Sequence, residues 1–139
     1  MADNLSKILK SLRKFGKEAE ELIEDTTLVT ASEIEADAKR LAPVDKGFLR
    51  NQIFTQEVDK QNYEIVAGAR YSAYLEFGTG GLVNVPDELK ELAIKFKGKG
   101  VRQINLAPQP FMYPALVKGR VNYVKDLKDN LNDLTKKYD

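Results

Sequence analysis

The stretch YSAYLEFGTGG, which runs from Tyr71 to Gly81, contains the residue types that could do chemistry. Its glycine cluster could bind a phosphate, and the carboxylate beside the cluster could act as a catalytic acid. A P-loop, however, needs a spaced glycine pair, a Lys-Ser/Thr pair and then a helix, whereas LVNVP follows here. Glycine clusters otherwise mark turns. We therefore predict no bound nucleotide or other cofactor, and a turn with a contact loop made of Gly78, Thr79, Gly80 and Gly81.

Glu76 is the carboxylate of this stretch, and its surroundings in the sequence argue against a catalytic acid. Paired-carboxylate catalysis requires a second acid held close to the first, and no residue near Glu76 supplies one. The spacing favours a structural ion pair between Glu76 and Arg50. The chain also has no His and no Cys, which removes the commonest general base, the commonest zinc ligand and every thiolate site. We predict no enzyme activity, no catalytic residue, no metal site and a reducing compartment.

The stretch KFKGKGVR is the best candidate for a contact with nucleic acid. Its four cations create a local field, and its two glycines would let the backbone approach a phosphate. No recognition helix, RNP aromatic pattern or zinc module accompanies it, and 22 basic against 21 acidic residues leave a net charge of only +1. The plainest interpretation is a solvated loop. Contact with DNA and contact with another protein stay open as alternatives, through Lys95, Lys97, Lys99 and Arg102.

The elements that must position these residues begin with one long helix, predicted from about Asp3 to Leu41. Apolar residues recur along it at steps of three and four, and Pro43 ends it. At about 1.5 Å per residue this helix exceeds the width of a small domain, so we expect residues 1–25 of a single domain (1–139) to project and to need a partner. There is no signal-peptide core and no apolar run of roughly 20 residues. We expect a soluble, intracellular protein without membrane contact.

The remaining pattern predicts an α+β fold, with a long N-terminal helix and a C-terminal helix packed on a small antiparallel sheet. Two strand-like runs, Gln52–Val58 and Tyr63–Ala69, form a hairpin. A helical turn at SAYLEFG, a helix that starts at Pro86 and a short strand at VRQINLA follow, and the second long helix starts at Pro114. Between two prolines, Phe111 is expected to plug the core. The glycine-containing loops at 78–84 and 97–102 are expected to contribute little to folding.

Three segments, LAPVDKGFLRNQI, YSAYLEFGTGG and APQPFMYPAL, together resemble the tail-completion and head–tail joining proteins of long-tailed bacteriophages and prophages, the tail components like the gene-ten product of phage HK97. Order and spacing agree over about residues 30 to 120. Lys46 and Gln52 depart from the Thr and Ser that the family usually has. The positions that carry the resemblance are Pro43, Asp45, Gly47, Leu49, Arg50, Tyr74, Glu76, Phe77, Pro110, Phe111 and Pro114.

The resemblance implies a structural protein that forms a ring, hexameric in that family, at the head-proximal end of the tail. Its partners would be other copies of itself, the tail tube or terminator protein, and a neck or head-completion protein. It would sit in the virion at the head–tail interface, after a period in the host cytoplasm. The basic and then acidic N-terminal part of the long helix lies outside the resemblance. A solvated face and a polar contact between subunits both fit this charge pattern.

Overall fold

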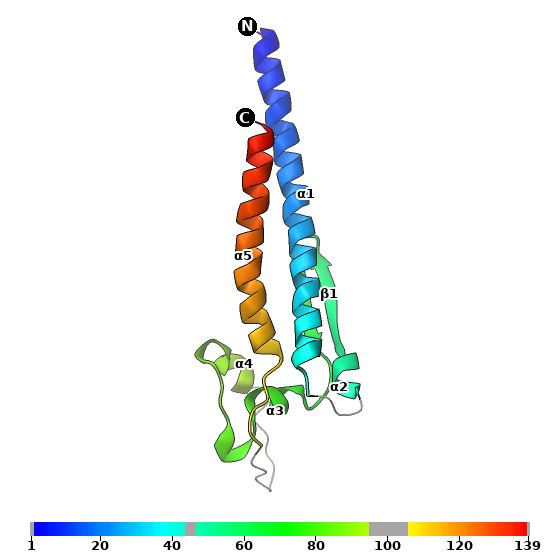
Figure 1. Cartoon of the computed structure of the whole chain (residues 1–139), viewed down its shortest axis with the longest axis vertical. Coiled ribbons are helices and arrows are strands. Elements are labelled where there is room, and N and C mark those ends of the chain that lie inside the picture. The colour runs from blue at the N-terminus through cyan, green and yellow to red at the C-terminus, as the bar shows by residue number, and fades with distance from the viewer. Residues whose placement is uncertain (1, 44–46, 95–105, 139) are drawn as a thin grey trace.

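The computed structural model describes residues 2–43, 47–94 and 106–138. Figure 1 shows α1 and α5 side by side as one long pair, with a β-hairpin against α1 and the short helices gathered at one end. The predicted α+β fold is confirmed. The elements are α1 (Ala2–Leu41), α2 (Phe48–Asn51), β1 (Ile53–Asp59), β2 (Asn62–Ala67), α3 (Ser72–Phe77), the 3-10 turns η1 (Gly80–Leu82) and η2 (Asp87–Leu89), α4 (Lys90–Ile94) and α5 (Met112–Lys137).

The first predicted helix is confirmed as one continuous element, although it contains the β-branched patch TTLV. The hydroxyls of Thr26 and Thr27 donate to the carbonyl oxygens of Leu22 and Ile23, both at 2.7 Å. A hydroxyl that bonds back to the preceding turn in this way lets Thr remain inside a helix. The helix ends two residues before Pro43, as the proline requires.

Helices α1 and α5 approach each other closely at Gly119. A Cβ at this position would overlap Cγ1 and Cδ1 of Ile34, so the glycine makes room for the Ile34 side chain. Further along, the hydroxyls of Thr27 and Tyr123 lie 2.7 Å apart. The rings of Phe15 and Tyr138 meet edge to face, with centroids 5.4 Å apart. These contacts run almost the full length of α5, while the N-terminal end of α1 extends beyond it (Figure 1).

The predicted hairpin is confirmed, with strand bounds within two residues of those expected. Strands β1 and β2 pair antiparallel from Ile53 opposite Ala67, with a shift in register between Glu57 and Asp59. At the turn, the carboxylate of Asp59 accepts hydrogen bonds from the backbone N–H of Gln61 and the side-chain amide of Asn62. The hairpin contacts α1 on a different side from α5.

The core lies where α1, the hairpin and the start of α5 meet. Phe111 has no exposed surface, which confirms the predicted burial of this ring between its prolines. Around it lie small and branched side chains from α1, from the first and third segments of the resemblance, and from the chain after β2: Ile34, Ala38, Ala42, Leu49, Ile53, Ala69 and Ala115.

One expectation for the segment between α3 and α5 is met in part, and another lies mostly outside the described residues. The helix predicted from Pro86 begins as a 3-10 turn and continues as α4, where Leu92 is exposed. Helix α4 lies at the edge of the domain, where few residues can cover it. Of the predicted strand VRQINLA, the described part is Leu106 and Ala107, and Leu106 forms an isolated bridge with Thr79. Phe96, Lys95, Lys97, Lys99, Arg102 and Asp45 lie outside the described residues.

Candidate functional site

The Glu76 carboxylate caps the N-terminus of α5. Oε2 accepts the backbone N–H of Phe111 at 2.9 Å and that of Met112 at 3.0 Å, and Oε1 accepts the N–H of Tyr113 at 2.7 Å. The first N–H groups of a helix have no partner within the helix, and that end of the helix attracts negative charge. The first position of α5 supplies no side-chain cap of its own. The buried side chain of Glu76, from α3, therefore acts as the cap. Both of its carboxylate oxygens accept hydrogen bonds from the backbone of α5 and have a structural role.

The predicted ion pair between Glu76 and Arg50 is wrong. The Arg50 guanidinium instead donates from Nε to the backbone carbonyl oxygen of Lys39, at 3.0 Å. That carbonyl belongs to the last turn of α1, where carbonyl groups lack partners within the helix. Arg50 thus ties α2 to the end of α1, while Glu76 ties α3 to the start of α5. The two charged side chains therefore do not pair with each other, and each forms hydrogen bonds with backbone groups instead.

The start of the glycine segment is part of the folded core of the domain. Gly78 is buried with φ +78°, and a Cβ there would lie 2.7 Å from the Leu106 carbonyl oxygen. Next to it, the Thr79 N–H donates to that same oxygen at 2.9 Å, and the Leu106 N–H donates to Thr79 Oγ1 at 3.0 Å. The expectation that this loop contributes little to folding is therefore wrong at Gly78 and Thr79. The exposed Gly80 and the neighbouring Gly81 remain candidates for contact.

The second and third segments of the resemblance form one hydrogen-bonded unit in space. The Gln109 N–H donates to the Leu75 carbonyl oxygen at 2.7 Å. This bond lies between the Thr79–Leu106 bridge and the Glu76 cap, so the chain before α5 follows α3 and its turn closely. The first segment joins them through Leu49 and Ile53, which pack in the same buried cluster as Phe111. The three segments thus build the end of the molecule where the short helices gather.

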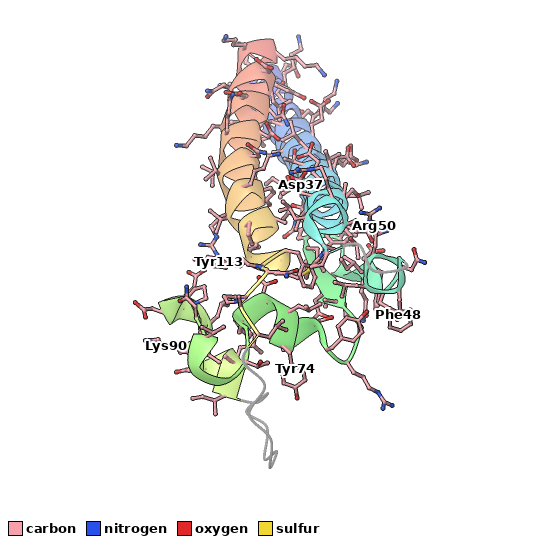
Figure 2. The ribbon with its side chains drawn as sticks, turned by 60° about the horizontal axis from the view of Figure 1, so that its bottom comes forward. Asp37, Phe48, Arg50, Tyr74, Lys90 and Tyr113 are labelled. Carbon is pink, nitrogen blue, oxygen red and sulfur yellow. The ribbon has the colours of Figure 1, made fainter. Side chains whose placement is uncertain are left out.

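This end carries exposed aromatic side chains. The rings of Phe48 and Tyr71 stack with centroids 6.1 Å apart, although Phe48 is 53% exposed. Tyr74 projects from α3 at the same end of the molecule, 42% exposed (Figure 2). Exposed aromatics are typical of protein contacts. Tyr74 is one of the motif positions predicted from the sequence, whereas Phe48 and Tyr71 stand inside the quoted segments but were not among those positions. We call Phe48, Tyr71 and Tyr74 the aromatic end.

A largely apolar hollow of about 390 Å³ lies between the hairpin, α3, α4 and α5, lined among others by Ile65, Leu92 and Leu116. The hydroxyl of Ser72 is buried there, and none of the described residues forms a hydrogen bond with it. Burial and the neighbouring Glu88 raise the pKa of the Tyr113 hydroxyl at its rim. Over the described ranges we find no group of three side chains able to hold a metal ion. No helix within these ranges is long and apolar enough to cross a membrane.

Comparison with known proteins identifies the family. The family model "Bacteriophage HK97-gp10, putative tail-component" matches residues 6–78, from the second turn of α1 to the end of α3. The match includes the first segment of the resemblance, the second segment as far as Gly78, and much of the N-terminal part of α1 that the resemblance left out, whereas the third segment lies beyond it. No curated protein and no solved structure matches the chain. Because the matched range covers more than half of the chain, the protein belongs to the HK97-gp10-like family of bacteriophage tail components.

Proposed function

We propose that the protein completes the phage tail and joins it to the head or neck by assembling as a ring of identical subunits. The observation that carries this proposal is the presence of two exposed apolar surfaces at opposite ends of an elongated molecule (Figure 1). A protein that joins two structures needs one contact surface for each. Family membership supports a place in the tail.

The first surface is the part of α1 that extends beyond α5. Phe15 meets Tyr138 at the end of α5, so about 13 residues of α1 precede this contact, a length of about 20 Å. The apolar stripe by which α1 packs on α5 continues into the part of α1 that extends beyond α5. There its side chains are exposed. We call it the N-terminal stripe: Leu5, Ile8, Leu9 and Leu12. We propose that the part of α1 before Phe15 forms a projecting extension that a partner covers. The rest of the range 1–25, which was also expected to project, lies alongside α5 instead.

The second surface is the aromatic end. Tyr74 stands on α3, which the Glu76 cap and the Thr79–Leu106 bridge fix, and Phe48 stands on α2, which Arg50 ties to the end of α1. The backbone under these rings is therefore fixed before a partner arrives. A rigid surface loses less conformational entropy on binding than a mobile one. In this proposal one surface meets the tail tube or terminator protein and the other meets a neck or head-completion protein. Gly80 and Gly81 follow α3 closely in the sequence, and we propose that they belong to this contact surface.

A ring is proposed because identical subunits that touch through two unlike surfaces close into rings when the rotation permits. The number six comes from the resemblance. The proposal places the assembled protein in the virion at the head–tail interface. The DNA-binding alternative depends on Lys95, Lys97, Lys99 and Arg102, which lie outside the described residues. The following experiment distinguishes it from the proposed function.

Deleting the gene from a phage or inducible prophage tests this function. We expect filled heads and separate tails in electron micrographs of the lysate, and joined infectious particles when the parent gene is supplied in trans. Joined particles at normal titre without the protein would refute the proposal. Empty heads, especially with a Lys97→Ser, Lys99→Ser and Arg102→Ser variant, would indicate a role in DNA packaging and favour the DNA-binding alternative.

A further inference from the structure

Helix α5 has a second apolar face, turned away from α1. Val117, Val121 and Val124 follow one another at steps of four and three residues, which places them on one stripe. All three are exposed, and Val121 is 65% exposed. The residues that touch α1 lie on the other side of the helix: Gly119 packs at Ile34 and Tyr123 bonds to Thr27. A residue two positions from Val121 points about 160° away from it.

This second face of α5 is basic. Lys125 and Lys128 are exposed beside the valine stripe, and neither takes part in an ion pair within the described ranges. The other nearby cations are engaged within the chain, because Lys118 pairs with Asp37 and Arg120 pairs with Glu88. Two lysines next to an exposed valine stripe are therefore available to an acidic partner.

Helix α1 has an outer face of the opposite charge. Leu28 and Val29 are exposed there, while the neighbouring Thr27 and Thr30 are turned inward. Acidic residues surround the two apolar side chains, and no Lys or Arg occurs in the sequence between positions 17 and 39. The acidic residues of this face, all exposed, are Glu21, Asp25 and Glu33.

We propose that a second copy of this chain covers these faces, with the outer face of α5 in one copy packed on the outer face of α1 in the next. The two faces carry opposite charges around apolar patches that point away from each other within one subunit. Because the two faces differ, each copy can take one neighbour on each side, which is the arrangement of a ring. The inference rests on the ring assembly proposed above and identifies the surface through which subunits meet.

The register within the chain predicts which residues meet. Glu18 lies level with Lys137, and Thr27 lies level with Tyr123, so residue numbers on α1 and α5 at one height add to a nearly constant value. Rotation about an axis parallel to the helices keeps every height unchanged. Val124 of one copy then comes level with Val29 of the next, and Lys128 comes level with Asp25.

Disulfide trapping on the purified full chain tests the interface, because the protein has no Cys of its own. A chain with Val29→Cys and Val124→Cys should give a ladder of dimers, trimers and larger species on oxidation. Both sites are exposed and face away from each other, so the fold is retained and no bond forms within one subunit. Each single-Cys variant, and a Val29→Cys, Ile94→Cys pair that places the second thiol on exposed α4, should give only background dimer. Absence of the ladder, or efficient dimers from Val124→Cys alone, would overturn the proposal.

Charge reversal supplies the second arm. Lys125→Glu with Lys128→Glu should lower the yield of the ladder several-fold, and adding Glu21→Lys with Asp25→Lys should restore it. A reversal that changes nothing at low salt, or a combined variant that folds but does not recover, would overturn the proposed pairing. The outcome is separate from that of the proposed function. Tails that contain the protein although no ladder forms would refute this interface alone, and a ladder from a protein absent from virions would refute the tail function alone.

Discussion

The Glu76 carboxylate accepts the backbone N–H of Tyr113 at 2.7 Å, which joins α3 to the first turn of a helix that begins 36 residues later, at Met112. Glu76 also accepts the N–H groups of Phe111 and Met112, so its carboxylate satisfies three consecutive backbone N–H groups. The next residue, Pro114, has no N–H to satisfy. A carboxylate with two oxygens and a proline in the first turn thus account for the unpaired donors at the start of α5.

Glu76→Ala should therefore destabilise the protein strongly. It removes a charged acceptor from three buried or partly buried donors, and hydrogen bonds to charged groups contribute about 1.5–3 kcal/mol each. We expect a loss of about 3 kcal/mol or more in urea unfolding, with a smaller loss for Glu76→Gln, which keeps one acceptor oxygen. Glu91→Ala on exposed α4 is the control and should change little. Equal stability of Glu76→Ala and Glu91→Ala would show that the cap is unimportant.

Phe111→Ala should cost about 3–5 kcal/mol, because truncating a fully buried ring loses transfer free energy and leaves a cavity. Phe111 has no exposed surface and belongs to the same buried cluster as residues of α1, α2 and β1. Phe48→Ala, which removes a ring of the same size from an exposed position, is the matched control. Thermal unfolding of both variants measures the difference. A Phe111→Ala protein that melts with the parent would refute the assignment of this ring as the central core residue.

Gly119→Ala should destabilise the α1–α5 contact, by about 1–3 kcal/mol for an overpacked core. The added methyl overlaps Ile34 at Cγ1, close to the backbone, so a change of rotamer at the end of the side chain does not relieve it. A Gly119→Ala, Ile34→Ala double variant should cost less than the sum of the two single changes, since the clash is absent. Gly16→Ala is the control, because nothing lies within 4 Å of its new methyl. The Gly16→Ala change should stabilise α1 by up to about 1 kcal/mol. If the losses of stability from Gly119→Ala and Ile34→Ala simply add in the double variant, the close packing of these two residues would be contradicted.

The periodic elements of this fold were predictable, and the contacts between distant backbone groups were not. The apolar stripes of α1 and α5 and the alternation of apolar and polar residues in the hairpin can be read from residue types. The sequence therefore predicted the bounds of these elements within a few residues. Phe111 was predictable because two prolines flank it. The partner of Glu76 was not, because a backbone N–H has no residue type and nothing in the sequence links position 76 to positions 111–113. The same holds for Gly78, whose burial depends on Leu106 lying across it.

Acid should weaken the hairpin turn through Asp59. The backbone N–H of Gln61, and then the Asn62 amide, hold the pKa of this carboxyl below its usual value. A depressed pKa in the folded state means that the carboxylate stabilises the fold above the pKa of the unfolded chain, and that this stabilisation is lost as pH falls through the folded pKa. The melting temperature of the parent should therefore exceed that of Asp59→Ala near pH 7, and the gap should close toward pH 2. A gap independent of pH would show that ionised Asp59 does not stabilise the turn.

The aromatic end should matter for assembly and little for folding. Phe48 and Tyr74 are both about half exposed and lie outside the buried cluster around Phe111. Replacing exposed side chains away from caps and cores changes stability by roughly ±0.5 kcal/mol, so Phe48→Ser with Tyr74→Ser should keep the melting temperature nearly unchanged. In a phage we expect heads and tails that form but do not join, since the proposed partner loses its aromatic contacts. Val58→Ser on the exposed hairpin is the control and should give normal titre. Joined particles at normal titre from the double variant would show that this end contacts neither head nor tail, and would leave the N-terminal stripe and the helix faces as the remaining candidates for assembly.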